Sequence, residues 1–181
     1  MSIEIKFLEK CSIPSDINEH LPTLKKYAEE CDIIVEFGVR DVVSTWALLA
    51  GKPKEMISVD SSNCNLSDAS KLALEEGIKF TFIQEDSRII DLPNHIDLLF
   101  IDTWHVYEQL KLELNRHSNK VSKFIIMHDT TTFGINGETP GHIGLTPAIN
   151  EFLISDIGSQ WSVLEEYTNC NGLTILKRNY E

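Results

Sequence analysis

The amino-acid sequence predicts an α/β fold: a mostly parallel sheet of seven strands, helices on both of its faces and an antiparallel hairpin at the C-terminal end. Three observations predict it. Apolar runs of strand length alternate with segments of helical periodicity through most of the chain. Two of those runs, Ile96–Ile101 and Lys123–Met127, are largely apolar, as expected for strands buried on both faces. The last two runs flank the spacer Thr168–Gly172, which suits a hairpin turn. This alternation favours a Rossmann-like sheet with right-handed crossovers.

Residues 1–31 are expected to form a helical segment ahead of the core. One helix is predicted from Asp16 to Glu30, because apolar residues recur there at three- and four-residue spacing. The apolar face of that helix consists of Leu21, Leu24, Tyr27 and Ala28. The core follows at residues 32–181, and the whole chain of 181 residues is expected to be one domain.

In the core, each predicted strand is a short apolar run, and the helices between the strands are expected at Val42–Ala50, Leu66–Glu76 and Val106–His117. Gly77 is a suitable C-terminal cap for the second of these helices. The strands are expected at Ile33–Phe37, Met56–Asp60, Lys79–Ile83, Ile96–Ile101, Lys123–Met127, Ser162–Tyr167 and Leu173–Leu176.

The glycine-rich stretch from Thr130 to Leu145 has no regular pattern and is expected to be a mobile loop. After it, Thr146 and Pro147 suit the N-cap and first turn of a last helix that runs to Ile154. His142 in the loop is expected either at the surface or, if the loop acts as a lid, over a bound substrate.

Composition narrows the classes of partner. The formal net charge of −12 argues against nucleic acid, because phosphate contacts need a basic surface. No apolar run reaches the roughly 18 residues of a membrane span, and the N-terminus lacks the pattern of a signal peptide. The cysteines lie far apart, without zinc-site spacing, and are expected to be reduced thiols in a cytoplasm. A small molecule is the expected partner.

Two neighbouring strands of the predicted sheet are each followed by an acid and a histidine. The first strand end supplies Asp102 and His105, and the second supplies His128 and Asp129. Because ligands of open α/β sheets bind at the carboxyl ends of strands, these side chains are expected to form one polar site. Such a site can bind a divalent cation or move a proton. Each residue also has a structural interpretation, as a helix cap, a solvated side chain or a loop contact.

Three other strand ends suit an adenosine ligand. Gly38 lets the backbone turn close to a ligand at the N-terminus of the next helix. Asp60 can accept hydrogen bonds from both ribose hydroxyls, and Asp86 from an adenine amino group. The alternative is that Gly38 only makes a turn and Asp60 only caps a helix. Arg40 and Val43 stand where a dinucleotide motif has its later glycines, which disfavours NAD.

Four segments carry a family resemblance: Glu36–Arg40 with Ser44 and Thr45, Val59–Asp60, Asp97–Asp102 with His105, Tyr107 and Glu108, and Phe124–Thr130. Their order and spacing resemble class I S-adenosylmethionine-dependent methyltransferases. Within that class the chain is most similar to the group of cephalosporin hydroxylase and the rhamnosyl and macrolide-sugar O-methyltransferases. The resemblance covers roughly residues 30–155.

The resemblance implies a cofactor site and a Mg²⁺ site, or a site for another divalent cation, with Asp102 and Asp129 as the metal ligands. Many relatives have a second acid where this chain has Thr130, so the third protein ligand is open. Relatives usually have glycine in place of Val42, whose side chain is in a position to crowd the methionine end of the cofactor. The implied S-adenosylmethionine site consists of Glu36, Gly38, Val39, Arg40, Ser44, Asp60, Ser61, Asp86, Ser87 and Asp102.

We therefore expect an S-adenosylmethionine-dependent and Mg²⁺-dependent O-methyltransferase that acts on a hydroxyl of a sugar, glycan or similar small polyol. Asp102 and Asp129 would hold the cation, which lowers the pKa of the acceptor hydroxyl. His105 is the leading general base and His128 the second candidate, because imidazole titrates near neutral pH. Trp104 is expected to pack within the fold or to stack on a sugar face.

Two alternatives stay open. One is a methyltransferase-like binding domain without transfer activity, and the other is a different nucleotide-dependent enzyme on the same fold, such as an oxidoreductase or a sugar-modifying enzyme. The chain has no long N-terminal extension with which to build a substrate pocket. A homodimer is therefore a further expectation, together with the absence of nucleic-acid and membrane partners.

Overall fold

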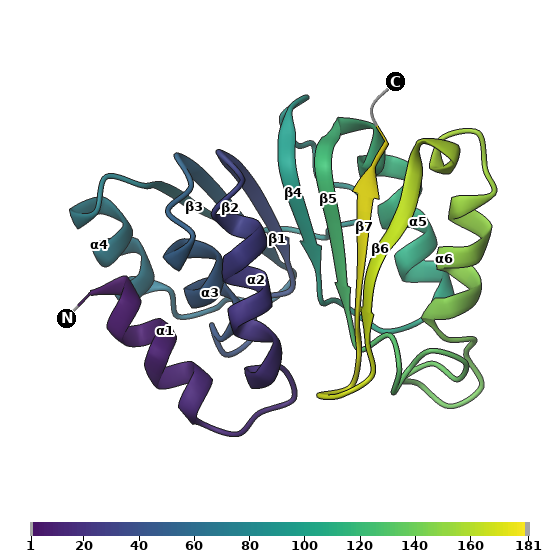
Figure 1. Cartoon of the computed structure of the whole chain (residues 1–181), viewed down its shortest axis with the longest axis horizontal. Helices are drawn as coiled ribbons and strands as arrows, with labels where there is room; N and C mark the ends of the chain where they lie inside the picture. The colour runs from purple at the N-terminus through teal and green to yellow at the C-terminus, as the bar shows by residue number, and fades with distance from the viewer. Residues whose placement is uncertain (1, 180–181) are drawn as a thin grey trace.

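A computed structural model describes residues 2–179 of the chain. Seven strands in this part of the chain form one sheet in the order β3-β2-β1-β4-β5-β7-β6 (Figure 1). Neighbouring strands from β3 to β5 are parallel, and β7 is antiparallel to both β5 and β6. The predicted fold is confirmed, including the hairpin. The strands are β1 (Ile33–Phe37), β2 (Glu55–Asp60), β3 (Lys79–Gln84), β4 (Ile96–Ile101), β5 (Val121–His128), β6 (Trp161–Tyr167) and β7 (Leu173–Arg178).

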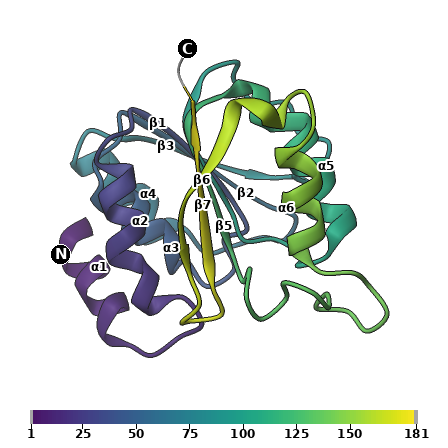
Figure 2. The same ribbon diagram turned by 45° about the vertical axis from the view of Figure 1, so that its right-hand side comes forward.

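Helices cover both faces of the sheet (Figure 2). One face carries α1 (Ile3–Ser12), α2 (Leu21–Ala28), α3 (Ser44–Ala50) and α4 (Ser67–Glu75), and the other carries α5 (Tyr107–His117) and α6 (Leu145–Leu153). Short 3-10 turns occupy Asn18–His20, Ser118–Lys120 and Gly158–Gln160.

Successive residues of each central strand point to opposite faces and so feed two separate cores. In β1, Ile34 packs in the cluster that contains Leu24 of α2, whereas Val35 packs in the cluster that contains Leu114 of α5 and Phe152 of α6. All five of these side chains are buried. The central strands β1 and β4 are therefore covered on both faces.

Three helix starts differ from the predictions. The segment predicted as a helix from Asp16 is a 3-10 turn followed by α2, because Pro22 fixes the backbone at the first turn and has no N–H to continue an earlier helix. Helix α3 begins at Ser44 rather than Val42, since Val42 has a positive φ. Helix α6 has Gly144 as its N-cap instead of Thr146.

The glycine-rich segment ahead of α6 lacks helix and strand, as predicted, but hydrogen bonds tie it to the body of the protein. Asn136 and Ile143 form an isolated β-bridge. The Ile143 carbonyl accepts from the N–H of Tyr107 at 2.8 Å, and the His105 carbonyl accepts from the N–H of Glu138 at 3.0 Å. The loop therefore lies against the turn between β4 and α5, and Glu138 is placed beside His105.

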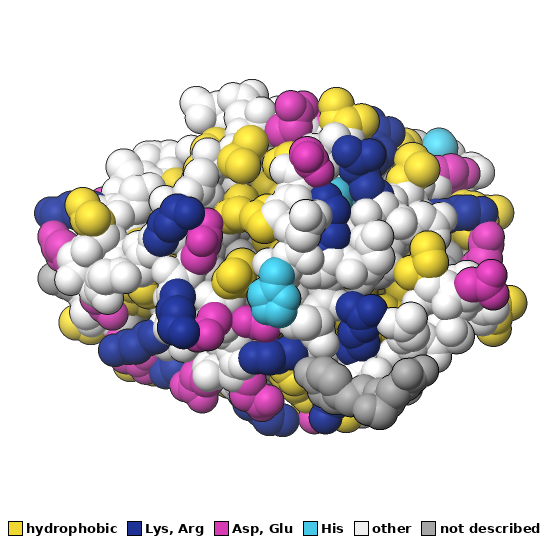
Figure 3. Space-filling view, turned by 90° about the horizontal axis from the view of Figure 1, so that it is seen from above, with side chains coloured by type: hydrophobic (Ala, Val, Ile, Leu, Met, Phe, Trp, Pro, Cys, Tyr) yellow, Lys and Arg dark blue, Asp and Glu magenta, His cyan; other side chains and the backbone are white. Residues whose placement is uncertain are grey.

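The carboxyl ends of the parallel strands lie at the same end of the sheet. Strand β1 has β2 on one side and β4 on the other, so the chain order reverses between β1 and β4. Such a switch point is where open α/β sheets bind ligands. The opposite end of the sheet, seen in Figure 3, carries basic and acidic side chains that are mixed rather than separated into patches of one charge. Within the described residues no helix has the length and apolar content to cross a membrane.

Candidate active site

The turn after β1 brings backbone atoms of three strands together. Gly38 has a φ of +85°, and a β carbon added there would lie 1.9 Å from the backbone oxygen of Asp102. Only glycine allows both this conformation and this approach. The N–H of Gly38 donates to the Val59 carbonyl at 2.9 Å, and the N–H of Asp102 donates to the Phe37 carbonyl at 2.8 Å. The ends of β1, β2 and β4 are thus joined around Gly38.

Arg40 and Val42 in the same loop also have positive φ values, 41° and 57°. A β-branched residue in this region is a strained outlier, and strain of this kind concentrates at functional sites. The Val42 side chain is buried in the core beneath α3 and does not line the cavity described below. Val42 was expected to crowd the cofactor, but its side chain does not line this cavity.

Asp60, at the end of β2, holds this loop in place. Its Oδ2 accepts from the backbone N–H groups of Val39 at 2.8 Å and Arg40 at 3.1 Å, and its Oδ1 accepts from the N–H of Ser62 at 2.8 Å. Burial acts to raise the pKa of Asp60, but the three N–H groups outweigh it and the pKa is lowered. The ionised carboxylate therefore faces the cavity with lone pairs to spare.

Glu36 lies behind the loop rather than in the cavity. It is fully buried and accepts hydrogen bonds from the hydroxyls of Ser44 at 2.6 Å, Ser58 at 2.6 Å and Thr45 at 2.9 Å. Burial raises its pKa to about 7 although these hydroxyls act in the opposite direction. Of the residues implied for the cofactor site, Glu36 is the one that does not line the cavity; it supports Ser44, which does.

At the end of β3, Asp86 and Ser87 line the cavity in different ways. Both carboxylate oxygens of Asp86 are within 3.0 Å of the guanidinium of Arg88, and Oδ1 also accepts from the Arg88 N–H at 2.8 Å. The hydrogen bonds from Arg88 lower the pKa of Asp86. Ser87 is buried and forms part of the cavity wall. Asp86 is therefore largely engaged by the protein itself.

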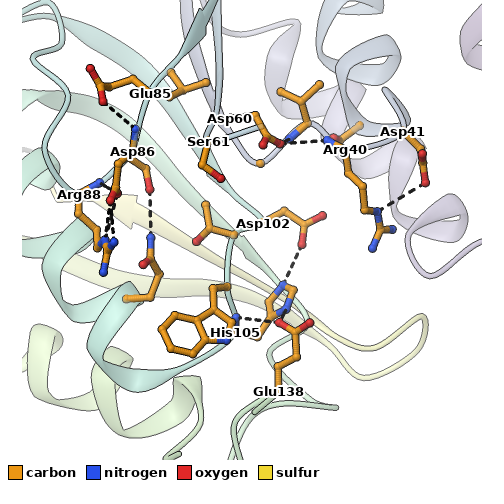
Figure 4. A pocket seen from close by; sticks show the side chains of 18 of the residues that line it. Arg40, Asp41, Asp60, Ser61, Glu85, Asp86, Arg88, Asp102, His105 and Glu138 are labelled. Atoms are coloured by element: carbon orange, nitrogen blue, oxygen red, sulfur yellow. Dashed lines mark hydrogen bonds and ion pairs between the residues drawn. The ribbon is translucent and has the colours of Figure 1, made fainter. Parts of the chain in front are cut away.

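These strand ends surround a cavity of about 470 Å³, shown in Figure 4. That volume falls in the range of about 300–1,000 Å³ typical of small-molecule sites. Asp60 and Asp86 lie toward one side of the view, and Asp102, His105 and Glu138 toward the other. The predicted cofactor residues that line the cavity are Gly38, Val39, Arg40, Ser44, Asp60, Ser61, Asp86, Ser87 and Asp102.

The ring nitrogens of His105 lie within hydrogen-bonding distance of three carboxylates. Its Nε2 is 3.1 Å from Asp102 Oδ1 and 3.0 Å from Asp129 Oδ2, and its Nδ1 is 3.1 Å from Glu138 Oε2. Burial acts to lower the pKa of His105, but the hydrogen bond to Asp102 and the other two carboxylates raise it. In this arrangement Nε2 lies between the two aspartates, and Nδ1 lies at Glu138. The predicted meeting of Asp102, His105 and Asp129 is confirmed.

His128 is buried behind Asp102 and does not line the main cavity. Its Nε2 donates to the Cys170 carbonyl at 3.0 Å, and its Nδ1 is 3.3 Å from Asp102 Oδ1. Burial acts to lower its pKa, but Asp102 raises the pKa to about 9. His128 is therefore poorly placed to take a proton from a ligand in the main cavity.

Asp102, His128 and Asp129 form a cluster that fits a divalent cation. Each offers one ligand atom, and these atoms lie within 4.8 Å of one another. Asp129 has a φ of +60°, and its buried Oδ1 accepts no hydrogen bond within the described residues. The imidazole makes the donor set as suitable for Mn²⁺ or another transition metal as for Mg²⁺. His105 bonds to the same two carboxylates, so a cation would compete with it for their oxygens.

Two residues at the mouth of the cavity come from the loop and the turn beside it. Glu138 was not predicted as a site residue, because a loop residue leaves no periodic signal. The loop holds it beside His105. Trp104 is 41% exposed; its Nε1 donates to Thr139 Oγ1 at 3.0 Å, and its ring lies 5.2 Å from the ring of His142. The indole thus forms cavity wall rather than core.

A second group of polar residues, which was not predicted from the sequence, lies on α5. Gln109, Glu113 and His117 are buried polar residues spaced four apart, so they share one face of the helix. Glu113 accepts from Ser87 at 2.5 Å, from Gln109 at 2.7 Å and from Thr103 at 2.9 Å. The polar residues at positions i, i+4 and i+8 of the helix were the sequence signal from which this group could have been predicted.

Solved structures share this fold. The chain is similar to a Corynebacterium glutamicum protein (TM-score 0.68, 15% identity, 99% of this chain and 90% of that one) and to a provisionally assigned O-methyltransferase from Klebsiella pneumoniae (0.66, 12%, 98% and 90%). It is also similar to the N-methyltransferase NodS from Bradyrhizobium japonicum in complex with S-adenosylhomocysteine (0.66, 10%, 99% and 100%).

At these identities the likeness shows the fold alone, which is the Rossmann-like fold of methyltransferases. No protein-family profile matches the chain, and no curated protein sequence matches it at a significant level.

Proposed function

We propose that the protein is an S-adenosylmethionine-dependent methyltransferase. The observation that carries the proposal is the cavity at the switch point between β1 and β4. The ionised carboxylate of Asp60 and the close backbone turn at Gly38 lie on its wall, beside the cluster of Asp102 and His105. An acid at the end of β2 suits ribose hydroxyls, and the polar cluster suits the chemistry of an acceptor. The similar NodS structure contains S-adenosylhomocysteine, the product of such a reaction.

The finer proposal is O-methylation of a hydroxyl on a sugar, glycan or similar polyol. A hydroxyl must lose its proton as the methyl group is transferred, and His105 is the residue at the cavity mouth that can accept it. Glu138 holds Nδ1–H, which leaves Nε2 for the acceptor. As long as Nε2 donates to Asp102 and Asp129, His105 cannot accept a proton. Release of those two contacts is therefore part of the proposal.

A divalent cation is the group that would release them. Asp102, His128 and Asp129 would hold it, and such a cation supplies Lewis-acid stabilisation of a developing alkoxide. If Asp102 and Asp129 were ligands of the cation, His105 would keep Glu138 as its partner at Nδ1. Trp104 then offers an exposed ring beside the mouth on which a sugar face can stack.

Turnover with a chelator tests the metal, and calorimetry tests the cofactor. S-adenosylhomocysteine is titrated into the protein, and methyl transfer to a panel of sugars is then measured with Mn²⁺, Mg²⁺ or EDTA. We expect binding in every case and turnover only with a cation. Asp102→Asn should abolish turnover, whereas Asp91→Asn, at a carboxyl that is 91% exposed, serves as the control.

The outcomes separate the proposals. Absence of S-adenosylhomocysteine binding would refute the methyltransferase assignment. Binding without transfer to any acceptor would favour a binding domain. Turnover that persists in EDTA and in Asp102→Asn would show that the cation assignment is wrong while the cofactor assignment stands.

A further inference from the structure

The wall of the cavity next to Ser87 rests on a polar stripe of α5. Gln109 is 7% exposed, and both Glu113 and His117 are fully buried. His117 Nε2 lies 2.8 Å from the Ser87 carbonyl and donates to it, while Gln109 and Glu113 bond to the Ser87 hydroxyl. Burial lowers the pKa of His117, so the ring is neutral with its proton on Nε2. Ser87 is therefore fixed at both its backbone and its side chain.

Glu113 is at the centre of this stripe and collects three donors. The hydroxyl of Ser87 donates at 2.5 Å, the amide of Gln109 at 2.7 Å and the hydroxyl of Thr103 at 2.9 Å, all to Oε1. These three donors come from the end of β3, from α5 and from the end of β4, and each lines the cavity. Glu113 itself does not line it. The carboxylate thus orders three cavity-facing side chains without touching the cavity.

These contacts decide which way the Gln109 amide points. The amide nitrogen, Nε2, donates to Glu113 Oε1 at 2.7 Å and to Ser87 Oγ at 3.0 Å, which uses both of its hydrogens. A flipped amide would set its oxygen against the Glu113 carboxylate and against the Ser87 oxygen, whose single proton already goes to Glu113. The amide oxygen of Gln109 takes no part in these contacts and accepts no hydrogen bond within the described residues.

The wall made by Gln109, Ser87 and Thr103 consequently presents acceptors to a ligand. The protons of both hydroxyls and of the amide point to Glu113 or Ser87, so lone pairs remain for the cavity. Asp86 is nearby, but each of its oxygens is already in two contacts with Arg88. Gln109 is therefore the better placed acceptor for an amino group.

We propose that Glu113 holds Gln109 so that its amide oxygen accepts from the exocyclic amino group of adenine, which makes the site selective for adenine over hypoxanthine. The proposal rests on the S-adenosylmethionine site proposed above. Hypoxanthine has a carbonyl oxygen where adenine has the amino group. The carbonyl oxygen of hypoxanthine would face the amide oxygen of Gln109, so two acceptors would meet without a proton between them. A site that hydrogen-bonds the amino group of its ligand rejects an analogue without that group. Gln109 is a specificity residue here, and Glu113 is a positioning residue.

The test compares S-adenosylhomocysteine with its deaminated analogue, S-inosylhomocysteine, by calorimetric titration at pH 8, above the pKa of about 7 for Glu113. Wild type should bind the adenine compound at least about tenfold more tightly, the value of one buried hydrogen bond. Gln109→Leu should bring the two affinities together. Glu113→Gln adds a donor beside Gln109, allows the amide to flip, and should also reduce the ratio about tenfold. Asn115→Ala, at an exposed position of α5, should keep the wild-type ratio.

The outcomes distinguish this inference from the proposed function. If wild type binds neither compound, both are refuted. If wild type binds the adenine compound but binds the inosine compound equally well, the methyltransferase proposal stands and the inference is overturned, whatever the variants do. A wild-type preference that survives unchanged in Gln109→Leu and Glu113→Gln also overturns it, and would assign the preference to another residue.

Discussion

Replacing Gly38 by alanine tests the close approach on which the cavity depends. Gly38 and Gly77 both have positive φ values, 85° and 77°, but their surroundings differ. A β carbon at Gly38 would lie 1.9 Å from the Asp102 backbone oxygen, whereas one at Gly77 would meet nothing within 4 Å. Gly77 caps α4, with its own N–H bonded to Leu74 and that of Ile78 bonded to Ala73. The two alanine variants therefore share the backbone strain and differ in the steric clash.

The magnitudes follow from these distances. A non-glycine residue in the left-handed region costs roughly 1–2 kcal/mol, and the lower entropy of the unfolded alanine chain returns about 0.4–1 kcal/mol. Both effects are common to the two variants and cancel in their difference. At Gly38 the Asp102 backbone must move by more than about 1 Å to reach ordinary contact, and overpacking of this kind costs about 1–3 kcal/mol. Gly38→Ala should thus be less stable than Gly77→Ala by about 2 kcal/mol.

Urea denaturation at pH 7 measures that difference, and calorimetry with S-adenosylhomocysteine measures its effect on the site. We expect Gly38→Ala to lose binding and Gly77→Ala to keep it, because the hydrogen bonds from Gly38 to Val59 and from Asp102 to Phe37 both lie at the cavity wall. Equal midpoints and equal slopes for the two variants would refute the reasoning. Normal ligand binding by a folded Gly38→Ala protein would refute the link between this turn and the cofactor.

Three further predictions concern the carboxylates. Mn²⁺ at about a hundredfold excess over its dissociation constant should stabilise wild type by about 2.7 kcal/mol; a thermal midpoint that rises equally in Asp129→Asn would place the ion elsewhere. Glu138→Gln should lower the methyl-transfer rate by about tenfold with little change in cofactor affinity, as for partners that orient a reacting histidine; an unchanged rate would remove Glu138 from the site. Glu36 has a pKa of about 7 in the folded protein, above its unfolded value. The protonated group therefore contributes its full stabilisation below the unfolded pKa, and this contribution is lost as the pH rises through the folded pKa of about 7. Relative to Glu36→Gln, the unfolding free energy of wild type should fall by roughly 3 kcal/mol between pH 4.5 and pH 8, and a parallel pair of curves would contradict the shift.

Much of the fold could be predicted because the central strands have a strong and simple signal. Ile33–Phe37 and Ile96–Ile101 have the predicted bounds, since a strand buried on both faces is an apolar run that polar residues end abruptly. Helix starts were harder to place. The first turn of α6 is satisfied by carbonyls of Phe133 and Gly134 in the loop, so its cap depends on contacts that no local pattern contains.

The site divides in the same way. Residues at or just beyond the ends of strands, such as Asp60 and Asp102, could be predicted to share a cavity because topology alone brings strand ends together. Glu36 lies inside β1, two positions before Gly38, and its side chain is buried in the core. Glu138 reaches His105 only through the path of a loop, which sequence periodicity does not describe.

The central claim is that the cavity between β1 and β4 binds the adenosine moiety of S-adenosylmethionine. The most direct measurement is a calorimetric titration of S-adenosylhomocysteine into wild type and into Asp60→Asn. We predict one binding event per chain for wild type, and an affinity at least about tenfold weaker for Asp60→Asn, because an ionised acceptor of the ribose hydroxyls is lost. No binding to folded wild type, or equal binding by the two proteins, would contradict the account.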